Sequence, residues 1–395
     1  MFPTDVVIIA GARTPMARYQ GAYKDIPALE LGAIAAREAI RRAGANPAEF
    51  DHVVFGNVMQ TSADALYGAR HVGLKAGLKT ETPAVTVNRL CGSGIEAIAQ
   101  AAQRILLGEA TLVLAGGTEN MTQAPHVIRG GRTGFRLGEG KLEDSLVSAL
   151  TDTYCGFSMS DTAENLAKDS GITREASDVY ALRSQQAAEA AYRSGKMKDE
   201  IVPVEVKAGR KTEIFSADDH RRPETTMETL RSLPPAFRKD GILTAGNASG
   251  IVDGGAAVVV TNTKGAKERG WKPMGRIVSW AAVGVEPRIM GIGPVPATRM
   301  ALERAGMKLE QMDLIEVNEA FAPQYLAVEK ELGLDRKKTN VNGGAIALGH
   351  PLAATGTRLV LTLLYELRRR NARYGLATAC IGGGQGIAMI VESLS

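Results

Sequence analysis

The sequence predicts an α/β protein built from two similar halves, one of which carries a long insertion. Two observations predict this class. A segment recurs at an offset of 262 residues, so that residues 37–53 align with residues 299–315. Short apolar runs also alternate with amphipathic segments along both halves, which is typical of mixed sheets covered by helices. The chain has 395 residues, enough for two or three domains with buried cores.

Each copy of the repeat combines an amphipathic helix, a glycine that ends it (Gly44 and Gly306) and an apolar strand. The predicted strands are 6–10, 52–56, 84–88, 111–115 and 256–261 in the first half, and 275–282, 313–317, 339–342, 376–380 and 386–391 in the second. The predicted crossover helices are 29–43, 95–107, 296–305, 323–332 and 352–370. We expect a mixed sheet in each half and close packing of the two halves.

About 130 residues, 121–250, separate the last two strands of the first half and have no counterpart in the second. We expect helices in the middle of this insertion, at 162–195, and an exposed excursion beginning at His126. Long loops of this kind form lids, binding surfaces or oligomer contacts, and a solvated insertion without a role is the alternative. The expected domains are residues 1–120 with 251–272, the insertion 121–250, and residues 273–395.

The charge and cysteine content exclude several classes. Lys and Arg exceed Asp and Glu by only 4, and the one basic run is 368–370, so nucleic acid is not an expected partner. No apolar run approaches the roughly 18 residues of a membrane span. The first residues lack a secretory signal peptide, and we therefore expect a cytoplasmic protein. Three cysteines without a CxxC pair indicate neither a disulfide framework nor a metal site.

Two candidate catalytic residues precede helices in equivalent parts of the two halves. Cys91 follows a predicted strand and precedes the helix at Ile95, where the positive end of the helix dipole favours thiolate. In the second half, a glycine-rich turn places His350 before a helix. Two such turns on facing sheets can converge, which predicts a Cys–His pair, although a small buried residue is the alternative interpretation of Cys91. We interpret the other histidines as surface or structural residues: His52, His71, His126 and His220.

Two further residues lie where predicted strands end. Cys380 opens a glycine-rich turn at the carboxyl end of a strand, where α/β folds place their ligands, and is a candidate second reactive thiol. Asn318 follows the strand that ends at Val317, and such a residue is a helix cap in most cases. The pair Gly92 and Gly94 lacks the third glycine of a dinucleotide fingerprint, and no P-loop is present, so nicotinamide and ATP chemistry are not expected.

Five motifs, in order and spacing, resemble the signatures of the thiolase family. They are NRLCGSG at 88–94, GTENM at 117–121, NEAFA at 318–322, GHP at 349–351 and CIGGG at 380–384. The resemblance covers the whole chain, and from Met290 to His350 it is strongest to the degradative 3-ketoacyl-CoA thiolases, including those of mitochondria. It implies the thiolase fold, in which two βαβαβαββ halves pack as a five-layer αβαβα core with an inserted loop domain.

The resemblance also implies an acyltransferase with a ping-pong mechanism and assigns a role to each catalytic candidate. Cys91 would take the acyl group as a thioester, and His350 would activate its thiol. Cys380 would act as the acid/base on the α-carbon of acetyl-CoA. Asn318 would hold a water that forms one oxyanion hole with His350. The backbone N–H groups of Cys91 and Gly382 would form the other.

For binding, the resemblance implies that CoA lies largely against the inserted domain. Arg222 would lie against the adenine, although Arg221 beside it leaves the register open by one residue. Ser249 would contact the pantetheine, and Met159 would form a wall of the acyl pocket. Phe321 would be a further substrate-binding residue. CoA and acyl-CoA would be substrates, with no permanently bound cofactor.

The family forms dimers through its core domains, and the excursion at 124–143 often joins two dimers. The length of the excursion in this chain favours a homotetramer.

Two departures from the family pattern affect specificity and packing. Ser158 stands where many acetoacetyl-CoA-forming thiolases carry histidine, which leaves the acyl length open. Ala353 stands where glycine is usual, and we expect its methyl group to shift the helix slightly without loss of activity. Sequence also leaves the direction open between cleavage of 3-ketoacyl-CoA and condensation of two acetyl-CoA.

Two other classes of protein are alternatives to a thiolase. A ketoacyl synthase-like condensing enzyme would need a second histidine or a comparable group where this chain has Cys380. A non-catalytic CoA-binding relative would tolerate loss of a thiol or of His350, and neither is lost.

Overall fold

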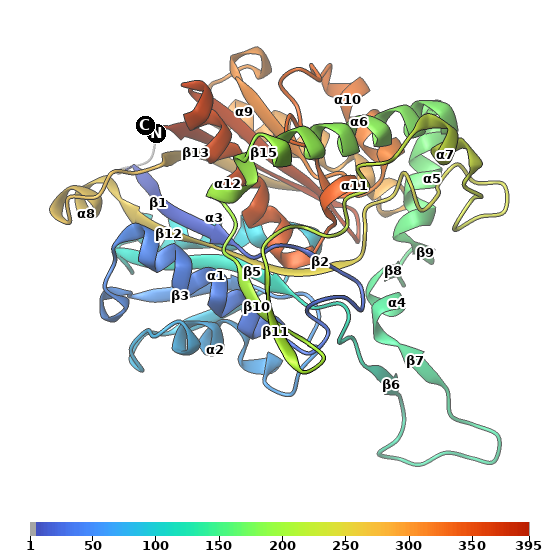
Figure 1. The fold of residues 1–395 in the computed structure, drawn as a ribbon, viewed down its shortest axis with the longest axis horizontal. Coiled ribbons are helices and arrows are strands. Elements are labelled where there is room, and N and C mark those ends of the chain that lie inside the picture. Colours follow the sequence, from blue (N-terminus) through green and yellow to red (C-terminus); the bar gives the residue numbers. More distant parts are fainter. Residues whose placement is uncertain (1–4, 395) are drawn as a thin grey trace.

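A mixed β-sheet shared by both halves forms the centre of the molecule (Figure 1). The computed structural model describes residues 5–394. The first half contributes β1 (Val6–Arg13), β3 (His52–Gly56), β4 (Ala84–Val87), β5 (Leu112–Glu119) and β12 (Val252–Asn262), in the order β4-β3-β5-β12-β1. The second contributes β13 (Gly275–Gly284), β14 (Leu314–Val317), β15 (Tyr374–Ile381) and β16 (Gln385–Ser393), in the order β14-β15-β16-β13. Pairing of β1 with β13 joins the halves, and the short β2 (Ala17–Arg18) pairs with β12.

Helices cover both faces of each half and produce five layers. One apolar cluster lies between the first half of the sheet and α1 (Ala28–Ala43) with α2 (Gly68–Lys75). A second cluster packs α3 (Ser93–Leu106) and α12 (Leu352–Arg370) between the two halves. A third packs α9 (Pro294–Ala305) and α10 (Ala322–Leu332) on the outer face of the second half. The five-layer αβαβα core implied by the resemblance is therefore present.

The predicted elements agree with the structure apart from one strand. The predicted helix 352–370 has the bounds of α12, and the other four predicted helices lie within two residues of the observed ones. The predicted strand 339–342 is wrong. In place of a strand beside β14, a single parallel bridge joins Thr339 to Ile315. In the first half, the edge strand β4 occupies the corresponding position. Asn340 has φ of 46°, which an extended strand does not permit. Its side-chain amide instead bonds the backbone N and O of Val317, in place of a ladder.

The two central helices cross at residues that the repeat makes equivalent. A Cβ on Gly94 of α3 would lie 2.3 Å from the backbone N of Thr357, and one on Gly356 of α12 would lie 2.5 Å from the backbone N of Ile95. Only residues without a Cβ allow the backbones to approach this closely. The crossing lies near the N-terminus of both helices, and it thus brings together the turns that carry Cys91 and His350.

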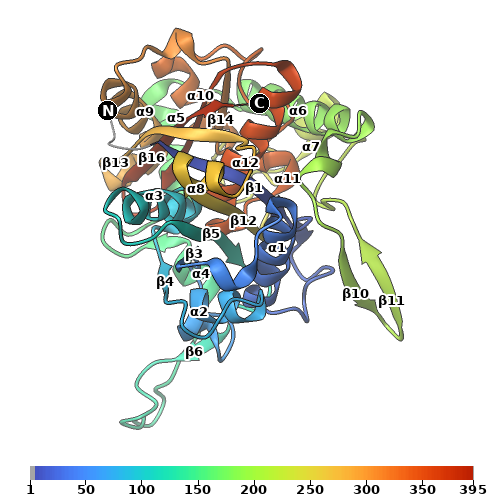
Figure 2. The ribbon, with the colours of Figure 1, turned by 90° about the vertical axis from the view of Figure 1, so that its left-hand side faces the viewer.

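The insertion forms several separate elements around this core (Figures 1 and 2). Its middle is helical as predicted, with α5 (Met159–Ser170) and α6 (Arg174–Arg193). An exposed excursion, residues 129–142, projects beyond the paired strands β6 (His126–Ile128) and β7 (Leu142–Asp144), also as predicted. The unpredicted elements are α4 (Ser145–Ala149), β8 (Thr151–Asp152), β9 (Phe157–Ser158), α7 (Met227–Ser232) and the projecting hairpin of β10 (Val204–Ala208) and β11 (Lys211–Phe215). Two short helices complete the chain outside the insertion, α8 (Thr263–Glu268) and α11 (Ala345–Leu348).

Candidate active site

A largely apolar cavity of about 350 Å³ lies where the first turns of α3 and α12 meet the insertion. Five residues predicted from the sequence line it: Cys91, Met159, Ser249, Phe321 and His350. The rest of the wall includes apolar side chains that the sequence analysis did not identify, among them Val147, Leu150, Phe237 and Met290. A thiol and an imidazole therefore face one water-poor space, which suits reactions on acyl groups.

The turn that carries Cys91 is closed by its own side chains. The hydroxyl of Ser93 accepts a hydrogen bond from the backbone N of Arg89 at 2.9 Å and donates to the carbonyl of Leu90 at 2.7 Å. Burial raises the pKa of the half-buried Cys91 thiol to about 11, and a hydrogen bond from the backbone N–H of Gly382 opposes this rise. Burial thus favours the neutral Cys91 thiol over the thiolate that the sequence predicts. The thiol thus requires a base.

His350 is held by hydrogen bonds at both of its ring nitrogens. The Oγ1 of Thr355 donates its single proton to the carbonyl of Pro351 at 3.0 Å, so it accepts from Nδ1–H of His350 at 2.6 Å. The other ring nitrogen, Nε2, lies 3.3 Å from the Nδ2 of Asn318 and is the proton acceptor. Burial, with the nearby Arg358 charge, lowers the pKa of His350 to about 3, which keeps the ring neutral. A neutral imidazole is the form that can take a proton from a thiol.

Cys380, Gly382 and Asn318 lie directly behind the cavity wall. The fully buried Cys380 packs with Met290 and Ala320, and burial with the neighbouring Cys91 raises the pKa of its thiol strongly. The backbone N–H of Gly382 donates a hydrogen bond to the Cys91 thiol. The Oδ1 of Asn318 is buried and has no hydrogen-bond partner in the described part of the chain. Buried polar atoms in folded proteins are nearly always paired, so this acceptor is a candidate partner for a water or a substrate atom.

Two buried glutamates that sequence reasoning missed hold the site together. The carboxylate of Glu319 accepts hydrogen bonds from two side chains of α6, Tyr180 Oη at 2.7 Å and Ser184 Oγ at 2.6 Å. It also accepts from Asn340 Nδ2 at 3.0 Å and from the backbone N of Ile346, in α11, at 3.1 Å. Glu119 accepts from the backbone N of Met59 at 2.9 Å and of Ala353 at 3.1 Å, and burial raises its pKa to about 7. Glu119 lies in the motif GTENM and Glu319 in the motif NEAFA. Their position inside these motifs was the signal that could have identified them.

The residues expected to contact CoA do not all lie together. Ser249 is fixed by a hydrogen bond from its backbone N to the carbonyl of Ala320 at 3.0 Å. Arg222 is exposed and lies outside the cavity lining. Arg221 is engaged by Glu189 at 2.7 Å and lies over the ring of Tyr192 at 3.6 Å. Of the two arginines, Arg222 is therefore the one whose side chain can reach a ligand.

The two departures from the family pattern have clear local roles. Ser158 caps α5 through a reciprocal pair of bonds with Asp161 and also lines the cavity. Ala353 is fully buried, and its methyl group faces Gly56, where a second Cβ would lie 3.3 Å away. The missing side chain at Gly56 leaves room for the extra methyl group.

Residues 5–394 contain neither a metal-binding cluster nor a membrane-spanning helix. Within that range, no cluster of three or more His, Cys, Asp or Glu side chains could hold a metal ion. Over the same residues, no helix combines the length and the apolar character needed to span a membrane.

Relatives with similar sequences are enzymes of acyl-CoA metabolism. The chain is 52% identical over 389 residues to a human protein named 3-ketoacyl-CoA thiolase, mitochondrial, with 98% of each chain covered. It is 49% identical over 391 residues to an acetyl-CoA acetyltransferase of Cupriavidus necator, covering 98% of this chain and 99% of the relative. The crystal structure of human mitochondrial 3-ketoacyl-CoA thiolase has a TM-score of 0.98 and 52% identity, covering 99% of both chains, and its complex with CoA has a TM-score of 0.96.

The predicted cytoplasmic location is wrong. Human, orangutan and bovine relatives at 52% identity are named as mitochondrial proteins. The prediction rested on the missing pattern of a secretory signal, a basic segment followed by an apolar core. Mitochondrial targeting segments are amphipathic and rich in Arg and Ser, so the absence of a secretory pattern does not bear on them.

Family models cover nearly the entire chain. The thiolase N-terminal domain matches residues 6–264 and the thiolase C-terminal domain matches residues 271–393. The relatives are acyltransferases, and the ketoacyl synthase and binding-protein alternatives are set aside. The fold, the cavity and these matches agree that the chain belongs to the thiolase family and is a CoA-dependent acyltransferase.

Proposed function

We propose that this thiolase works through an acyl-Cys91 intermediate with His350 as the base. The observation that carries the proposal is the convergence of the Cys91 thiol and the neutral His350 ring on one apolar cavity. The thiol proton passes to Nε2 of His350, and the thiolate attacks the 3-keto carbon of the substrate. The N–H groups of Cys91 and Gly382 stabilise the resulting oxyanion, and Asn318 with His350 forms the second oxyanion hole through a water.

The second half of the reaction uses Cys380. When the carbon–carbon bond breaks, the departing acetyl-CoA enolate takes a proton from the Cys380 thiol. The Cys380 thiolate then takes the proton of an incoming CoA thiol, and the CoA thiolate attacks the acyl-Cys91 thioester. Cys91 leaves as a thiolate, regains its proton from His350, and the shortened acyl-CoA is released. In condensation the same groups act in reverse, and Cys380 removes the α-proton of the second acetyl-CoA. The raised pKa of Cys380 favours its thiol form, so this group readily regains its proton after each turnover.

For substrates, we infer a broad range of 3-ketoacyl-CoA in fatty acid β-oxidation, with acetoacetyl-CoA also accepted. Val147, Leu150 and Phe237 provide an apolar wall for an acyl chain, and Ser158 occupies little of the cavity. CoA enters as a substrate and binds through Ser249, Met159, Phe321 and Arg222. No permanently bound cofactor takes part.

We also propose a division of labour among three segments. Residues 1–120 with 251–272 and residues 273–395 form the catalytic core. The insertion 121–250 binds CoA, and its excursion joins dimers into a homotetramer.

Intact mass after brief incubation with acetyl-CoA tests the covalent step. We expect an adduct of about 42 Da on the unmodified chain that disappears in Cys91→Ala. Cys155→Ala is the matched control, because Cys155 lies outside the cavity, and it should keep the adduct. Cys380→Ala should acylate but fail to condense. An adduct that persists in Cys91→Ala would overturn the assignment.

A further inference from the structure

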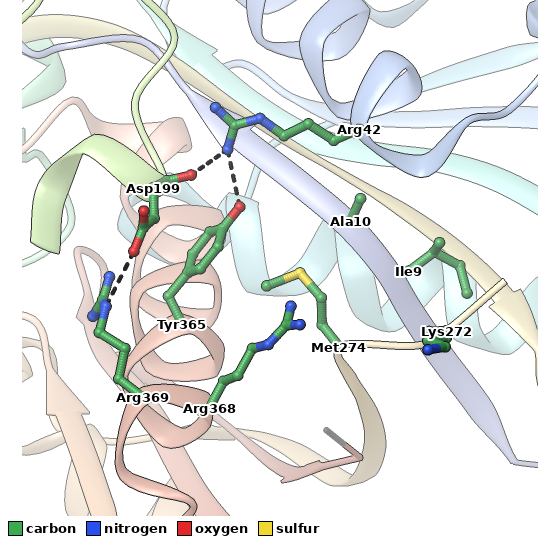
Figure 3. A pocket seen from close by; sticks show the side chains of 9 residues that line it. All are labelled: Ile9, Ala10, Arg42, Asp199, Lys272, Met274, Tyr365, Arg368 and Arg369. Carbon is green, nitrogen blue, oxygen red and sulfur yellow. Dashed lines mark hydrogen bonds and ion pairs between the residues drawn. The ribbon is translucent and has the colours of Figure 1, made fainter.

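Figure 3 shows a second pocket, which has a volume of about 670 Å³. It lies at the opposite end of α12 from the cavity that Cys91 and His350 line. It is bounded by β1, the end of α1, the chain just before β13 and the last turns of α12. No residue lines both pockets. With 19 residues, α12 is about 28 Å long, so ligands in the two sites would not touch.

The lining of this pocket is strongly positive. Four cationic side chains line it, those of Arg42, Lys272, Arg368 and Arg369, and Asp199 supplies the one carboxylate in the lining. A concave surface with one sign of charge concentrates ions of the opposite sign.

Two of the four cations are fixed by the protein. Arg42 donates from Nε to Glu38 at 2.7 Å and from Nη1 to the hydroxyl of Tyr365 at 2.9 Å. Arg369 donates to Asp199 at 3.2 Å and to Glu366 at 2.6 Å. These bonds hold two guanidinium groups rigidly in the wall of the pocket.

The other two cations have no protein partner. The side chains of Arg368 and Lys272 are exposed and form no hydrogen bond or ion pair with any residue in the range 5–394. Figure 3 shows the Arg368 guanidinium extending beside Met274, unconnected to its neighbours. An arginine in the last turn of a helix stabilises the helix dipole, and Arg368 has this position in α12. This role does not explain why its side chain lines a pocket that two other arginines also line. An anion between them would relieve the repulsion among these groups.

The floor of the pocket is apolar. Ile9, Ala10 and Met274 are buried side chains that form it. A volume of this size accommodates a small organic molecule as well as a bare ion.

We propose that this pocket binds a phosphorylated small molecule, whose phosphates contact Arg368 and Lys272 and whose organic part lies on Met274. The guanidinium fork matches the geometry of phosphate oxygens, and the lysine adds a mobile point charge. The site is separate from the catalytic reaction and leaves Cys91 and His350 untouched.

Calorimetric titration of the intact protein with ADP and with inorganic pyrophosphate tests the proposal. We expect saturable binding that weakens at least about tenfold in the double variant Arg368→Gln/Lys272→Gln, with thiolysis rates unchanged. The matched control is Arg210→Gln/Lys337→Gln, which removes two exposed cations that lie outside this pocket and outside the excursion, and it should retain the affinity. Arg222→Gln distinguishes ADP bound in the second pocket from ADP bound at the catalytic site. This variant should retain the affinity of the second pocket.

The two probes distinguish the part of the ligand that is recognised. Equal affinity for pyrophosphate and ADP would assign recognition to the phosphates alone, whereas tighter binding of ADP would add the contact with Met274. Absence of saturable binding by both probes would overturn the proposal, as would a double variant that binds as tightly as the unmodified protein.

Discussion

At the scale of single residues, two equivalent hydroxyls organise the two catalytic turns. The repeat aligns Ser93 with Thr355, and each hydroxyl donates to a backbone carbonyl of its own turn. The Ser93 hydroxyl accepts from the backbone, while that of Thr355 accepts from the His350 ring at 2.6 Å. We therefore predict that Thr355 is a positioning residue, which selects the tautomer in which Nε2 of His350 can accept a proton.

Replacement of Thr355 separates this role from simple packing. Thr355→Val keeps the shape but leaves Nδ1–H of His350 buried without an acceptor, at a cost of about 1–3 kcal/mol. We expect single-turnover acylation by acetyl-CoA to slow at least about tenfold, with the KM for CoA unchanged. Thr355→Ser restores the acceptor and should restore the rate. Equal rates for the valine variant and the unmodified protein would contradict this role.

The ionisation of the catalytic pair predicts a pH dependence. Burial penalises both charged forms, so it raises the pKa of Cys91 to about 11 and lowers that of His350 to about 3. Between these values the free enzyme holds a neutral thiol beside a neutral imidazole. The alkylation rate of Cys91 by iodoacetamide should therefore rise about tenfold per pH unit from about pH 7 to about pH 9. Cys91→Ala supplies the background, and a rate independent of pH over this range would indicate a preformed ion pair instead.

At the scale of elements, the contact between α3 and α12 determines where the two turns meet. Their closest approach involves Gly94 and Gly356, whose missing side chains let one backbone lie on the other. Sequence could predict both helices and the glycine-rich turns before them from the repeat. It could not show that these glycines touch, because the contact joins residues 262 positions apart and depends on packing of the whole core.

Insertion of one methyl group into this contact should be costly. A Cβ at position 94 would lie 2.3 Å from the backbone N of Thr357, and a backbone atom can yield only if the helix moves. We expect Gly94→Ala to lower the free energy of unfolding in urea by about 1–3 kcal/mol or more and to reduce thiolysis by separating Cys91 from His350. Gly131→Ala is the control, since its Cβ would meet only Ile128 in an exposed loop. An unchanged urea midpoint for Gly94→Ala would refute the importance of the crossing.

At the scale of the whole molecule, the catalytic cavity is assembled from three parts of the chain. The core halves supply Cys91 and His350, which motifs and the repeat could predict. The insertion supplies Val147, Leu150 and Phe237, which lie in segments without a counterpart in the second half and without a periodic pattern, so the sequence offered no signal for them. The strand predicted at 339–342 is absent because of contacts that are also distant in sequence. Asn340 donates hydrogen bonds to Glu319 and to the carbonyl of Val317, and its backbone has a positive φ that an extended strand does not permit.

The exposed excursion provides the last prediction, on assembly. Residues 129–142 are all exposed, and Phe135, Leu137 and Leu142 present large apolar side chains to solvent at the tip and base of the projecting loop. Side chains of this kind on one projection favour contact with another copy of the chain. We expect light scattering to show a tetramer for the intact protein and a dimer after deletion of residues 129–142.

The deletion should leave the catalytic core intact, because the removed residues line neither the Cys91 cavity nor the central sheet. The double substitution Phe135→Ser/Leu137→Ser keeps the loop but removes its apolar side chains, and it should also yield dimers. Acylation of Cys91 per chain reports whether each dimer remains folded. If the deleted protein is still a tetramer, another surface joins the dimers and the excursion has a different role.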